Sequence, residues 1–312
     1  MTATEHKNTW LFIINPKATQ VEVKRIGQKL ERELHHSGLH GIILVTKYKS
    51  HAISLVHEAI FSGIRQMVAV GGDGTIHEVV NGIMTQDICP STDITLAVLP
   101  MGTGNDWANH YQIPKEISGC MQLLKQGKIA IQDVGKLNYL KDGHPVTRYF
   151  NNVAGMAYDA FVVKKLAQKH RKPNALIYLF SVFAYLMKYK LQLAHVIADD
   201  QHFEHRYYTI NMGICPLSGG GMSLVPHAIP NDGKLALTLA EDLSKWDILI
   251  NTYRFYNRSL LRHPKVKGFQ VDRIEVQSLD EMPLLLEADG EFLGHTPVTC
   301  TLIPGALRIV IP

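Results

Sequence analysis

The amino-acid sequence predicts an α/β domain with a parallel sheet, followed by a mainly antiparallel β-sandwich domain with inserted helices. The chain has 312 residues, more than a single hydrophobic core usually serves. Up to about residue 130, short apolar segments alternate with segments of helical periodicity, as in right-handed βαβ units. Short strands dominate afterwards. We therefore expect one domain over 1–130, which a terminal strand at 305–312 can complete, and a second over 131–304.

The elements of the first domain follow from apolar runs bounded by Gly or Pro. Strands are expected at 10–14, 41–46, 67–70 and 95–99, and helices at 23–34 and 52–60. A further helix follows the third strand, because Ile76, Val79, Val80 and Ile83 have the spacing of one helix face.

The second domain is predicted in the same way. Strands are expected at 131–139, 146–151, 196–198, 207–214, 235–239, 269–277, 284–288, 298–302 and 307–311. Helices are expected at 159–170, 175–191 and 244–260, and Ser244 with Asp247 predicts a capping box at the start of the last. Asp142-Gly143 is a hairpin turn signal between the first two strands.

Composition limits the class of protein. Hydrophobic residues make up 46% and charged residues 19%, as in ordinary soluble globular chains, and the net charge of +4 lacks a nucleic-acid footprint. The four cysteines (Cys89, Cys120, Cys215, Cys300) are scattered, which predicts reduced thiols in a cytoplasmic protein. No signal peptide is evident, and the apolar helix at 175–187 is too short to span a membrane.

The segment Gly71-Gly72-Asp73-Gly74-Thr75 lies between a predicted strand and a predicted helix. A strand, a glycine loop and a helix N-terminus place backbone N–H groups and a positive dipole end around a small volume, which suits a phosphate. Glycine in this loop permits close approach of the backbone to a phosphate and also permits positive-φ conformations. An ordinary tight βα turn is the alternative, but Asp73 would face a phosphate only with a cation between them.

A second loop of the same kind, Gly102-Thr103-Gly104-Asn105-Asp106, follows the next predicted strand. Both loops lie at the carboxyl ends of predicted parallel strands, and Asn15 and Thr46 also lie at such ends. Parallel sheets of this kind bind their ligands at the carboxyl ends of the strands. Near the C-terminus, Asp289-Gly290-Glu291 follows an apolar strand, and taken alone it predicts a hairpin turn.

Together these motifs resemble the diacylglycerol kinase catalytic family, which includes bacterial soluble lipid kinases and sphingosine kinases. The resemblance rests on GGDGT at 71–75, GTGND at 102–106, Asn15-Pro16 and the late Asp-Gly-Glu, and it extends through 133–135, 151–160 and 230–235. It implies an NAD kinase/diacylglycerol kinase-like fold. It also implies ATP-dependent transfer of the γ-phosphate to the hydroxyl of a lipid such as diacylglycerol or a sphingoid base.

The resemblance also assigns roles to residues. The ATP-binding set would be Asn15, Thr46, Gly71, Gly72, Asp73, Gly74, Thr75, Glu78, Gly102, Thr103 and Asn105. Asp73, Asp106 and Asp133 would organise Mg²⁺, partly through water. Asp289 would be the base toward the lipid hydroxyl, with Glu291 supporting it. A second, structural Mg²⁺ would lie at Ile229, Asp232 and Lys234, two of them contributing backbone carbonyls.

Two departures from the family pattern accompany the resemblance. Lys17-Ala18-Thr19 stands where the family usually has Ser-Gly, which bears on nucleotide affinity, and His77 stands where Asn is frequent. An NAD kinase-like enzyme is one alternative, although an Asn-Glu pair would be expected in place of GTGND. A catalytically silent lipid-binding or regulatory protein of the same fold is another.

The expected partners are ATP and a lipid alcohol, with peripheral membrane contact and no nucleic acid. The basic run from Lys164 to Lys172 is either a solvated helix face or a docking site for anionic lipid. The sequence does not decide between a monomer and a homodimer, nor does it identify the lipid.

Overall fold

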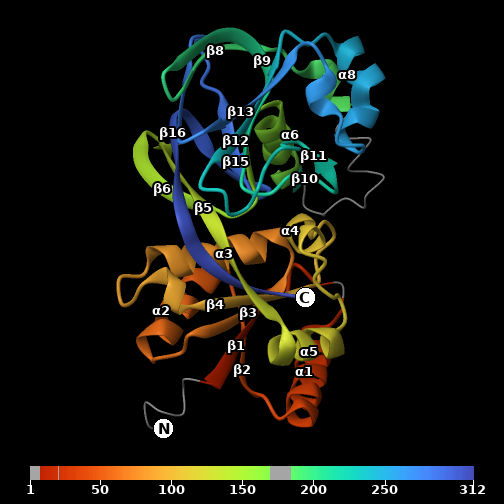
Figure 1. Ribbon diagram of the computed structural model, residues 1–312, viewed down its shortest axis with the longest axis vertical. Helices are drawn as coiled ribbons and strands as arrows, with labels where there is room; N and C mark the ends of the chain where they lie inside the picture. Colours follow the sequence, from red (N-terminus) through yellow and green to blue (C-terminus); the bar gives the residue numbers. More distant parts are fainter. Residues whose placement is uncertain (1–7, 20, 169–183) are drawn as a thin grey trace. The chain divides into compact units, whose positions relative to one another are not determined.

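The computed structural model describes residues 8–19, 21–168 and 184–312. The chain forms two compact units (Figure 1). Unit 1 comprises the residues up to Asp133 together with Gly305–Pro312, and unit 2 comprises Val134–Pro304. The chain passes between the units twice, within β5 (Lys128–Lys141) and within β16 (Glu291–Ile311).

Unit 1 is built on a parallel sheet in the order β4-β3-β1-β2. The strands are β1 (Thr9–Ile14), β2 (His40–Val45), β3 (Gln66–Gly71) and β4 (Thr95–Pro100). The end of β16 pairs in parallel with β4, with Arg308 opposite Thr95. The central strands β1, β3 and β4 are buried along almost their whole length, which explains why their sequences are continuous apolar runs.

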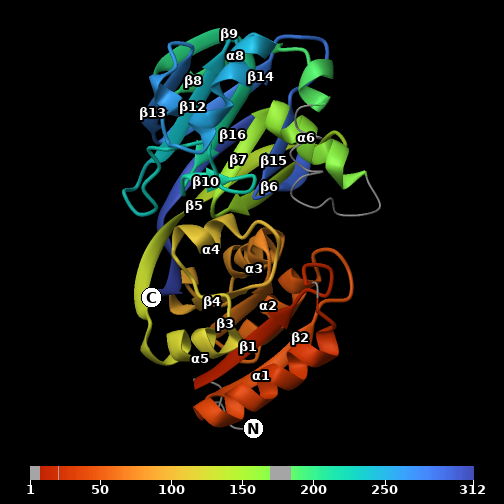
Figure 2. The ribbon, with the colours of Figure 1, turned by 90° about the vertical axis from the view of Figure 1, so that its right-hand side faces the viewer.

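Helices cover both faces of this sheet (Figure 2). α1 (Val23–Ser37) packs with α5 (Ile117–Gln126), and α2 (His51–Phe61) packs with α3 (Asp73–Thr85). A short α4 (Asp106–His110) follows the second glycine loop, and a 3-10 turn, η2 (Ser91–Asp93), precedes β4. The buried residues of α1 are Ile26, Leu30 and Leu34, which have the spacing of one helix face, whereas Val23 at its start is half-buried.

Unit 2 is an antiparallel β domain. The strands β7, β9, β8, β14, β16 and β15 pair successively and return to β7, so the pairing closes into a ring. Their bounds are β7 (Val153–Ala157), β8 (Gln192–Ala198), β9 (Gln201–Gly213), β14 (Arg273–Ser278) and β15 (Leu285–Ala288). Outside the ring, β12 (Leu235–Glu241) pairs with β9, β13 (Val266–Val271) with β12, and β6 (His144–Phe150) with β5; β10 (Leu217–Ser218) pairs with β11 (Met222–Ser223).

The helices of unit 2 are short. They are α6 (Tyr158–Ala167), α8 (Lys245–Asn251) and the 3-10 turns η3 (Thr252–Phe255) and η4 (Leu260–Arg262). Residues 184–188 are also helical. Of the helix expected over 175–191, residues 189–191 are not helical and residues 175–183 lie outside the described residues. The capping box of Ser244 and Asp247 is confirmed, because the Asp247 amide donates to Ser244 Oγ and the Ser244 amide donates to the Asp247 carboxylate.

Three sequence-based predictions were wrong. The strands expected at 298–302 and 307–311 belong to one continuous strand, β16. The helix expected over 244–260 ends at Asn251, where Asn251 Nδ2 and Thr252 Oγ1 bond to carbonyls of the preceding turn and η3 takes over. The strand expected over 269–277 is two strands, because the Asp199 carboxylate accepts the amides of Asp272 and Arg273 and turns the chain there. Asp199 lies 73 residues before Asp272, so local spacing could not reveal the second break.

The four cysteines are free thiols. Within the described ranges, none of the helices combines the length and the hydropathy that crossing a bilayer requires. The described part of the basic run has Lys164 Nζ 5.0 Å from the Phe292 ring centre and Lys165 Nζ 5.7 Å from that of Phe161. The remainder of that run, residues 169–172, lies outside the described residues.

Candidate active site

The first glycine loop joins β3 directly to α3. Gly72 is the N-cap, and the helix begins at Asp73, earlier than the sequence suggested, so an acidic side chain lies at the positive end of the helix dipole. A methyl group at Gly71 would clash with the Thr75 side chain. The Thr75 hydroxyl is buried and has no hydrogen-bond partner among the residues described here, which leaves a donor and acceptor at the helix start.

The second glycine loop contacts the first. A methyl group at Gly102 would lie 2.5 Å from the Gly72 Cα, and one at Gly72 would lie 3.1 Å from the Gly102 Cα. The glycines are therefore required by backbone contact. The expectation of positive φ was wrong for them, since Gly72 has φ −104, and Asn105 has the left-handed conformation instead, with φ 55. Asn105 shapes its loop by accepting from Gly102 N at 3.0 Å and donating to Gly102 O at 2.8 Å.

The carboxylates of Asp73 and Asp106 face the same point beside Gly104. A methyl group built there would lie 3.2 Å from Asp73 Oδ2 and 3.6 Å from Asp106 Oδ2. The Trp107 amide, in the first turn of α4, donates to Asp73 Oδ1 at 3.3 Å and so ties the two loops together. Two convergent carboxylates form the kind of oxygen donor set that Mg²⁺ prefers.

Asp133 is buried in β5, and its Oδ1 accepts the Gly305 amide at 2.7 Å. The preceding Gln132 accepts hydrogen bonds from Trp107 Nε1 at 2.9 Å and Tyr111 Oη at 2.8 Å. Among the residues the structure describes, no group of three or more His, Cys, Asp or Glu is arranged to hold a metal ion. The predicted trio is thus not a ready-made set of direct ligands. Sequence reasoning missed Gln132, which joins β5 to α4.

Three other residues predicted near the nucleotide have structural contacts. Asn15 Oδ1 accepts the Lys17 amide at 3.0 Å, and the buried Thr46 bonds through its amide to Ile14 O at 2.9 Å. Glu78 accepts the amides of Ser50 at 2.8 Å and Ala52 at 3.4 Å, at the N-terminus of α2. These contacts account for Glu78 without a nucleotide, so its predicted role remains a prediction. Thr103, in the second loop, is exposed, and its predicted role remains a prediction.

In unit 2, Asp289-Gly290 forms the two-residue hairpin turn between β15 and β16, with φ of 51 and 79. Asp289 is nevertheless buried, at 5% exposure. Its Oδ1 accepts the amides of Asn152 at 3.0 Å and Val153 at 3.2 Å, and its Oδ2 accepts that of Asn151 at 3.2 Å. The corner is therefore the turn that its sequence predicts, with its carboxylate fixed by main-chain donors, and the role of Asp289 as a base remains a prediction. Glu291, the next residue of β16, is half-buried.

Two buried acids beside this corner were not identified from the sequence. Glu287 Oε2 accepts the Gly290 amide at 2.9 Å, and burial raises the pKa of Glu287 well above its usual value. Asp159 Oδ2 accepts from Thr209 Oγ1 at 2.6 Å, and burial raises its pKa to about 6. Both line a cavity of about 70 Å³ that Gly290 also borders. Ala157, just before α6, has a left-handed φ of 69, a strained conformation near this cavity.

The predicted structural metal loop is exposed. Asp232 Oδ1 accepts the amide of Lys234 at 3.0 Å, two residues on, and Gly233 has φ 74, as in an ordinary Asx turn. Lys234 Nζ binds both Asp272 oxygens at 2.8 Å. Ile229 is 52% exposed. The three predicted residues lie in one loop, and the structure gives them a turn and an ion pair.

Comparison with known families agrees with both units. The sequence matches the diacylglycerol kinase catalytic domain over residues 9–137 and the YegS C-terminal NAD kinase beta sandwich-like domain over residues 152–311. A diacylglycerol kinase of Staphylococcus epidermidis is 28% identical over 309 residues, covering 96% of this chain and 91% of that protein. One of Staphylococcus aureus is 28% identical over 294 residues, covering 92% and 87%.

Solved structures show the same fold. A diacylglycerol kinase structure from Bacillus anthracis has a TM-score of 0.71 at 21% identity, covering 98% of this chain and 97% of that one. Yeast NADH kinase has a TM-score of 0.54 at 11% identity, covering 98% of this chain and 84% of that one. Because the two family descriptions together span both units, the chain belongs to the diacylglycerol kinase family whose members carry a YegS-type C-terminal domain.

Proposed function

We propose that this protein is an ATP- and Mg²⁺-dependent lipid kinase that transfers the γ-phosphate of ATP to the hydroxyl of a lipid such as diacylglycerol or a sphingoid base. The observation that carries the proposal is the Asp289 carboxylate, which is buried and held by three main-chain amides although it belongs to a hairpin turn. A turn aspartate without a further task is usually exposed. The family to which the chain belongs supports kinase chemistry.

The two glycine loops of unit 1 fit a nucleotide phosphate. Gly72 and Gly102 are in backbone contact, and because neither has a side chain, a phosphate can approach the main chain of both loops. The amides of Thr75 and Ile76 donate to Gly72 O at the start of α3, and the helix dipole favours an anion at this end. The orphaned Thr75 hydroxyl adds a buried donor. Binding of ATP phosphates would use these groups.

Mg²⁺ fits between such phosphates and the carboxylates of Asp73 and Asp106. When bound, it would neutralise charge that develops on the transferred phosphoryl group. Asp133, held by the Gly305 amide, would contribute through water, since the described residues offer no direct three-ligand set. The repulsion between Asp73 and Asp106 in the absence of metal favours cation uptake.

Asp289 would accept the proton of the lipid hydroxyl. Three amide donors hold the carboxylate in one orientation, which reduces the entropy cost of aligning it with the hydroxyl. A carboxylate is a weak base, but the loose transition state of phosphoryl transfer lets the proton leave late. Glu287 fixes the backbone of the same corner through Gly290. Because the acceptor is a lipid, we also propose peripheral contact with a membrane.

The test is ATP consumption by the purified chain, with and without Mg²⁺, against diacylglycerol, a sphingoid base and NAD. Lipid-dependent turnover that yields a phosphorylated lipid would support the proposal. Turnover with NAD alone would indicate an NAD kinase-like enzyme, and lipid binding without turnover would indicate a silent relative.

A second arm of the test uses Gly72→Ala. The methyl group would lie 3.1 Å from the Gly102 Cα and would push the loops apart. We expect a raised KM for ATP. An unchanged KM would show that the nucleotide does not bind at these loops.

A further inference from the structure

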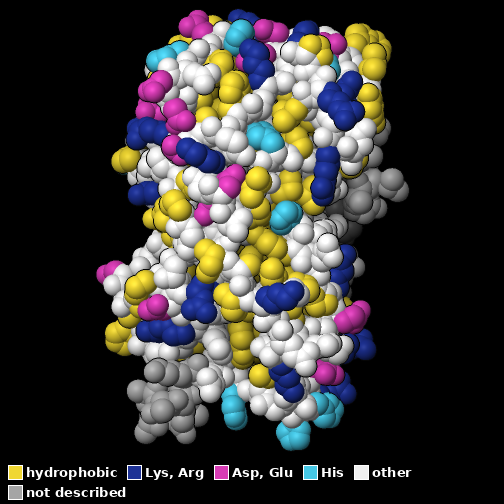
Figure 3. All heavy atoms as spheres, viewed as in Figure 1, with side chains coloured by type: hydrophobic (Ala, Val, Ile, Leu, Met, Phe, Trp, Pro, Cys, Tyr) yellow, Lys and Arg dark blue, Asp and Glu magenta, His cyan; other side chains and the backbone are white. Residues whose placement is uncertain are grey.

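The helix α8 and the turn η3 have a large apolar face exposed to solvent. Trp246 is 73% exposed, Ile250 70%, Tyr253 53% and Tyr256 51%. We call these four residues the α8 face. Trp246 and Ile250 have the i, i+4 spacing that puts side chains on one side of α8, and Tyr253 follows in η3. Hydrophobic side chains and basic ones lie next to each other in the upper right of Figure 3, where Figure 1 shows α8.

The core of unit 2 does not explain the α8 face. The same helix already contributes a buried side chain to the core, Ile248, with Leu249 and Phe255 packed against it. The α8 face therefore adds a second apolar surface with no intramolecular role in the described structure. Contiguous exposed apolar side chains of this size are characteristic of an interaction surface.

Positive charge is concentrated in the same segment. Residues 244–267 contain six Lys or Arg and one acid, Asp247. Lys265 pairs with Asp247 and Lys267 pairs with Glu241, so the border of the α8 face is formed by Lys245, Arg254, Arg258 and Arg262. Arg254 stacks on Tyr253, with Cζ 5.3 Å from the ring centre. Arg258 and Arg262 are exposed. The aromatic face is thus bordered by cations.

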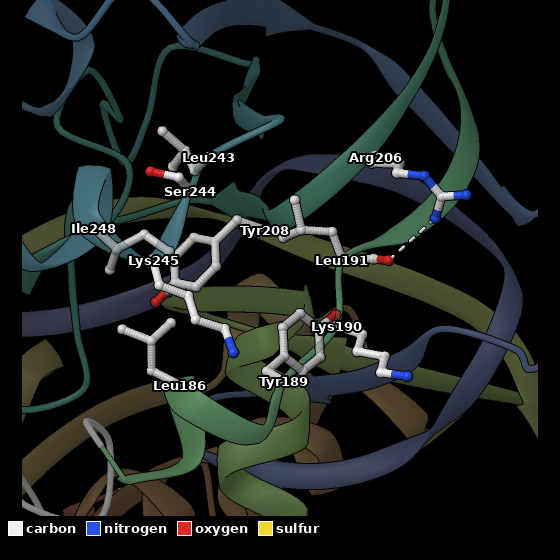
Figure 4. A pocket seen from close by; sticks show the side chains of 10 residues that line it. All are labelled: Leu186, Tyr189, Lys190, Leu191, Arg206, Tyr208, Leu243, Ser244, Lys245 and Ile248. Carbon is white, nitrogen blue, oxygen red and sulfur yellow. Dashed lines mark hydrogen bonds between the residues drawn. The ribbon is translucent and has the colours of Figure 1, made fainter.

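The basic border continues along a neighbouring pocket. A cavity of about 410 Å³ is bounded by Lys245 and Ile248 of α8 and by the segment 186–191. Figure 4 shows Leu243 and Ile248 on one side of this pocket and Lys190 and Arg206 on the other. Lys245 Nζ donates to the Met187 carbonyl, which attaches the start of α8 to that segment.

We propose that the α8 face is a membrane-docking surface that inserts into the headgroup region of an anionic lipid bilayer. Trp and Tyr prefer the membrane–water interface, and Lys or Arg beside them attract anionic headgroups. Charge complementarity thus selects a bilayer as the occupant. The proposal rests on the lipid kinase function, because it gives the enzyme a way to reach a membrane-dissolved acceptor. It concerns residues other than the basic run at 164–172.

The fluorescence of Trp246 gives a direct measurement. The other two tryptophans, Trp10 and Trp107, are buried at 5% and 1% exposure, so transfer of Trp246 into a bilayer would dominate any spectral change. Vesicles of phosphatidylcholine mixed with phosphatidylglycerol should shift the emission to the blue and carry the protein upward in flotation. Vesicles of phosphatidylcholine alone should do so much less.

The double variant Trp246→Ser/Ile250→Ser should lose vesicle binding by roughly tenfold or more. Phe61→Ser is the matched control, because Phe61 is 82% exposed at the end of α2 in unit 1 and lies outside the α8 face. Arg258→Glu/Arg262→Glu should reduce binding to anionic vesicles selectively. Equal binding by the Trp246/Ile250 variant and the wild type, or no binding of the wild type to anionic vesicles, would overturn the proposal.

Kinase assays separate this inference from the proposed function. With a short-chain acceptor dispersed in detergent, the Trp246/Ile250 variant should retain wild-type turnover, whereas its turnover on vesicles should fall with binding. Absence of turnover in every format would refute the kinase proposal and leave the vesicle-binding result to stand by itself. Equal turnover of variant and wild type on anionic vesicles would overturn the docking role.

Discussion

Two hairpins of unit 2 have the same turn and different surroundings. Asp142-Gly143 joins β5 to β6 with φ of 50 and 79, and Asp289-Gly290 joins β15 to β16 with φ of 51 and 79. Asp142 is exposed at its hairpin tip, whereas Asp289 is buried against the amides of residues 151–153. Local sequence determines the turn, and contacts across 136 to 138 residues determine whether its carboxylate is positioned for chemistry.

The largest expected effect is on turnover, and it comes from removing the carboxylate charge of the Asp289 hairpin but not that of the Asp142 hairpin. Asp289→Asn should reduce lipid phosphorylation by roughly 10²–10⁴-fold, the usual range for a general base. Nucleotide affinity should change little, whereas thermal stability should fall by about 1–3 kcal/mol, because the amide puts an NH2 donor where a carboxylate oxygen accepts a main-chain N–H. Asp142→Asn is the matched control and should leave turnover unchanged. Initial rates with a lipid acceptor measure both, and comparable losses in the two variants would remove the distinction.

The next effect concerns the buried acids around the Asp289 hairpin. The pKa of Asp159 is about 6 in the fold against an ordinary 3.8, so its contribution to stability is full below about pH 4 and is lost as pH rises through about 6. We expect the free energy of unfolding to fall by about 3 kcal/mol across this window. Asp159→Asn should flatten the decline, and Asp142→Asn should not. Denaturant melts at several pH values measure this, and identical pH profiles for wild type and Asp159→Asn would contradict it.

The glycines of the two hairpins provide a smaller, balanced test. Gly143 and Gly290 both have φ 79 and open space around the missing Cβ. Alanine at either position should therefore lower the free energy of unfolding by about 1–2 kcal/mol through backbone strain alone. Only Gly290→Ala should also lower turnover, since backbone strain there would displace the residue 290 amide, which donates to Glu287 beside Asp289. Melting curves and initial rates of the two variants measure these effects. An equal loss of activity in Gly143→Ala and Gly290→Ala would contradict the expected difference.

The smallest effect is expected at a third Asp-Gly turn. Asp232 is exposed and accepts the amide of Lys234, two residues away. Without Mg²⁺, Asp232→Ala should therefore lower the free energy of unfolding by less than about 1 kcal/mol. If the loop holds a structural Mg²⁺, the variant should also lose the rise in melting temperature that Mg²⁺ gives in the absence of ATP. An unchanged response to Mg²⁺ would leave Asp232 as a turn residue like Asp142.

The sequence was informative where a single segment carries the whole signal. Parallel strands, amphipathic helices, both glycine loops, the Ser244 capping box and the Asp142 hairpin could all be predicted, since each depends on spacing within a few residues. Breaks at Asn251 and Asp272 could not, because side chains that compete with the ladder decide them.

The candidate site shows the same limit. The sequence named Asp289 through its resemblance to a family, but not the amides that fix it, nor Gln132, Asp159 and Glu287. Those residues acquire their roles only when distant strands meet, as where Thr209 of β9 bonds to Asp159 of α6. No local pattern distinguishes a buried glutamate from an exposed one in an alternating strand. The signal that was available was a carboxylate among apolar neighbours, Leu284–Leu286 before Glu287.

The discontinuity of unit 1 has a consequence for biosynthesis. Asp133 and its hydrogen-bond partner Gly305 are separated by 172 residues, almost all of them belonging to unit 2. During translation, β4 must wait with an open edge until the end of β16 emerges, although domains generally fold as they leave the ribosome. An unpaired apolar strand edge attracts other chains. The nascent chain is therefore most exposed to misassociation while unit 2 is being made, and deleting residues 305–312 would prolong that state indefinitely.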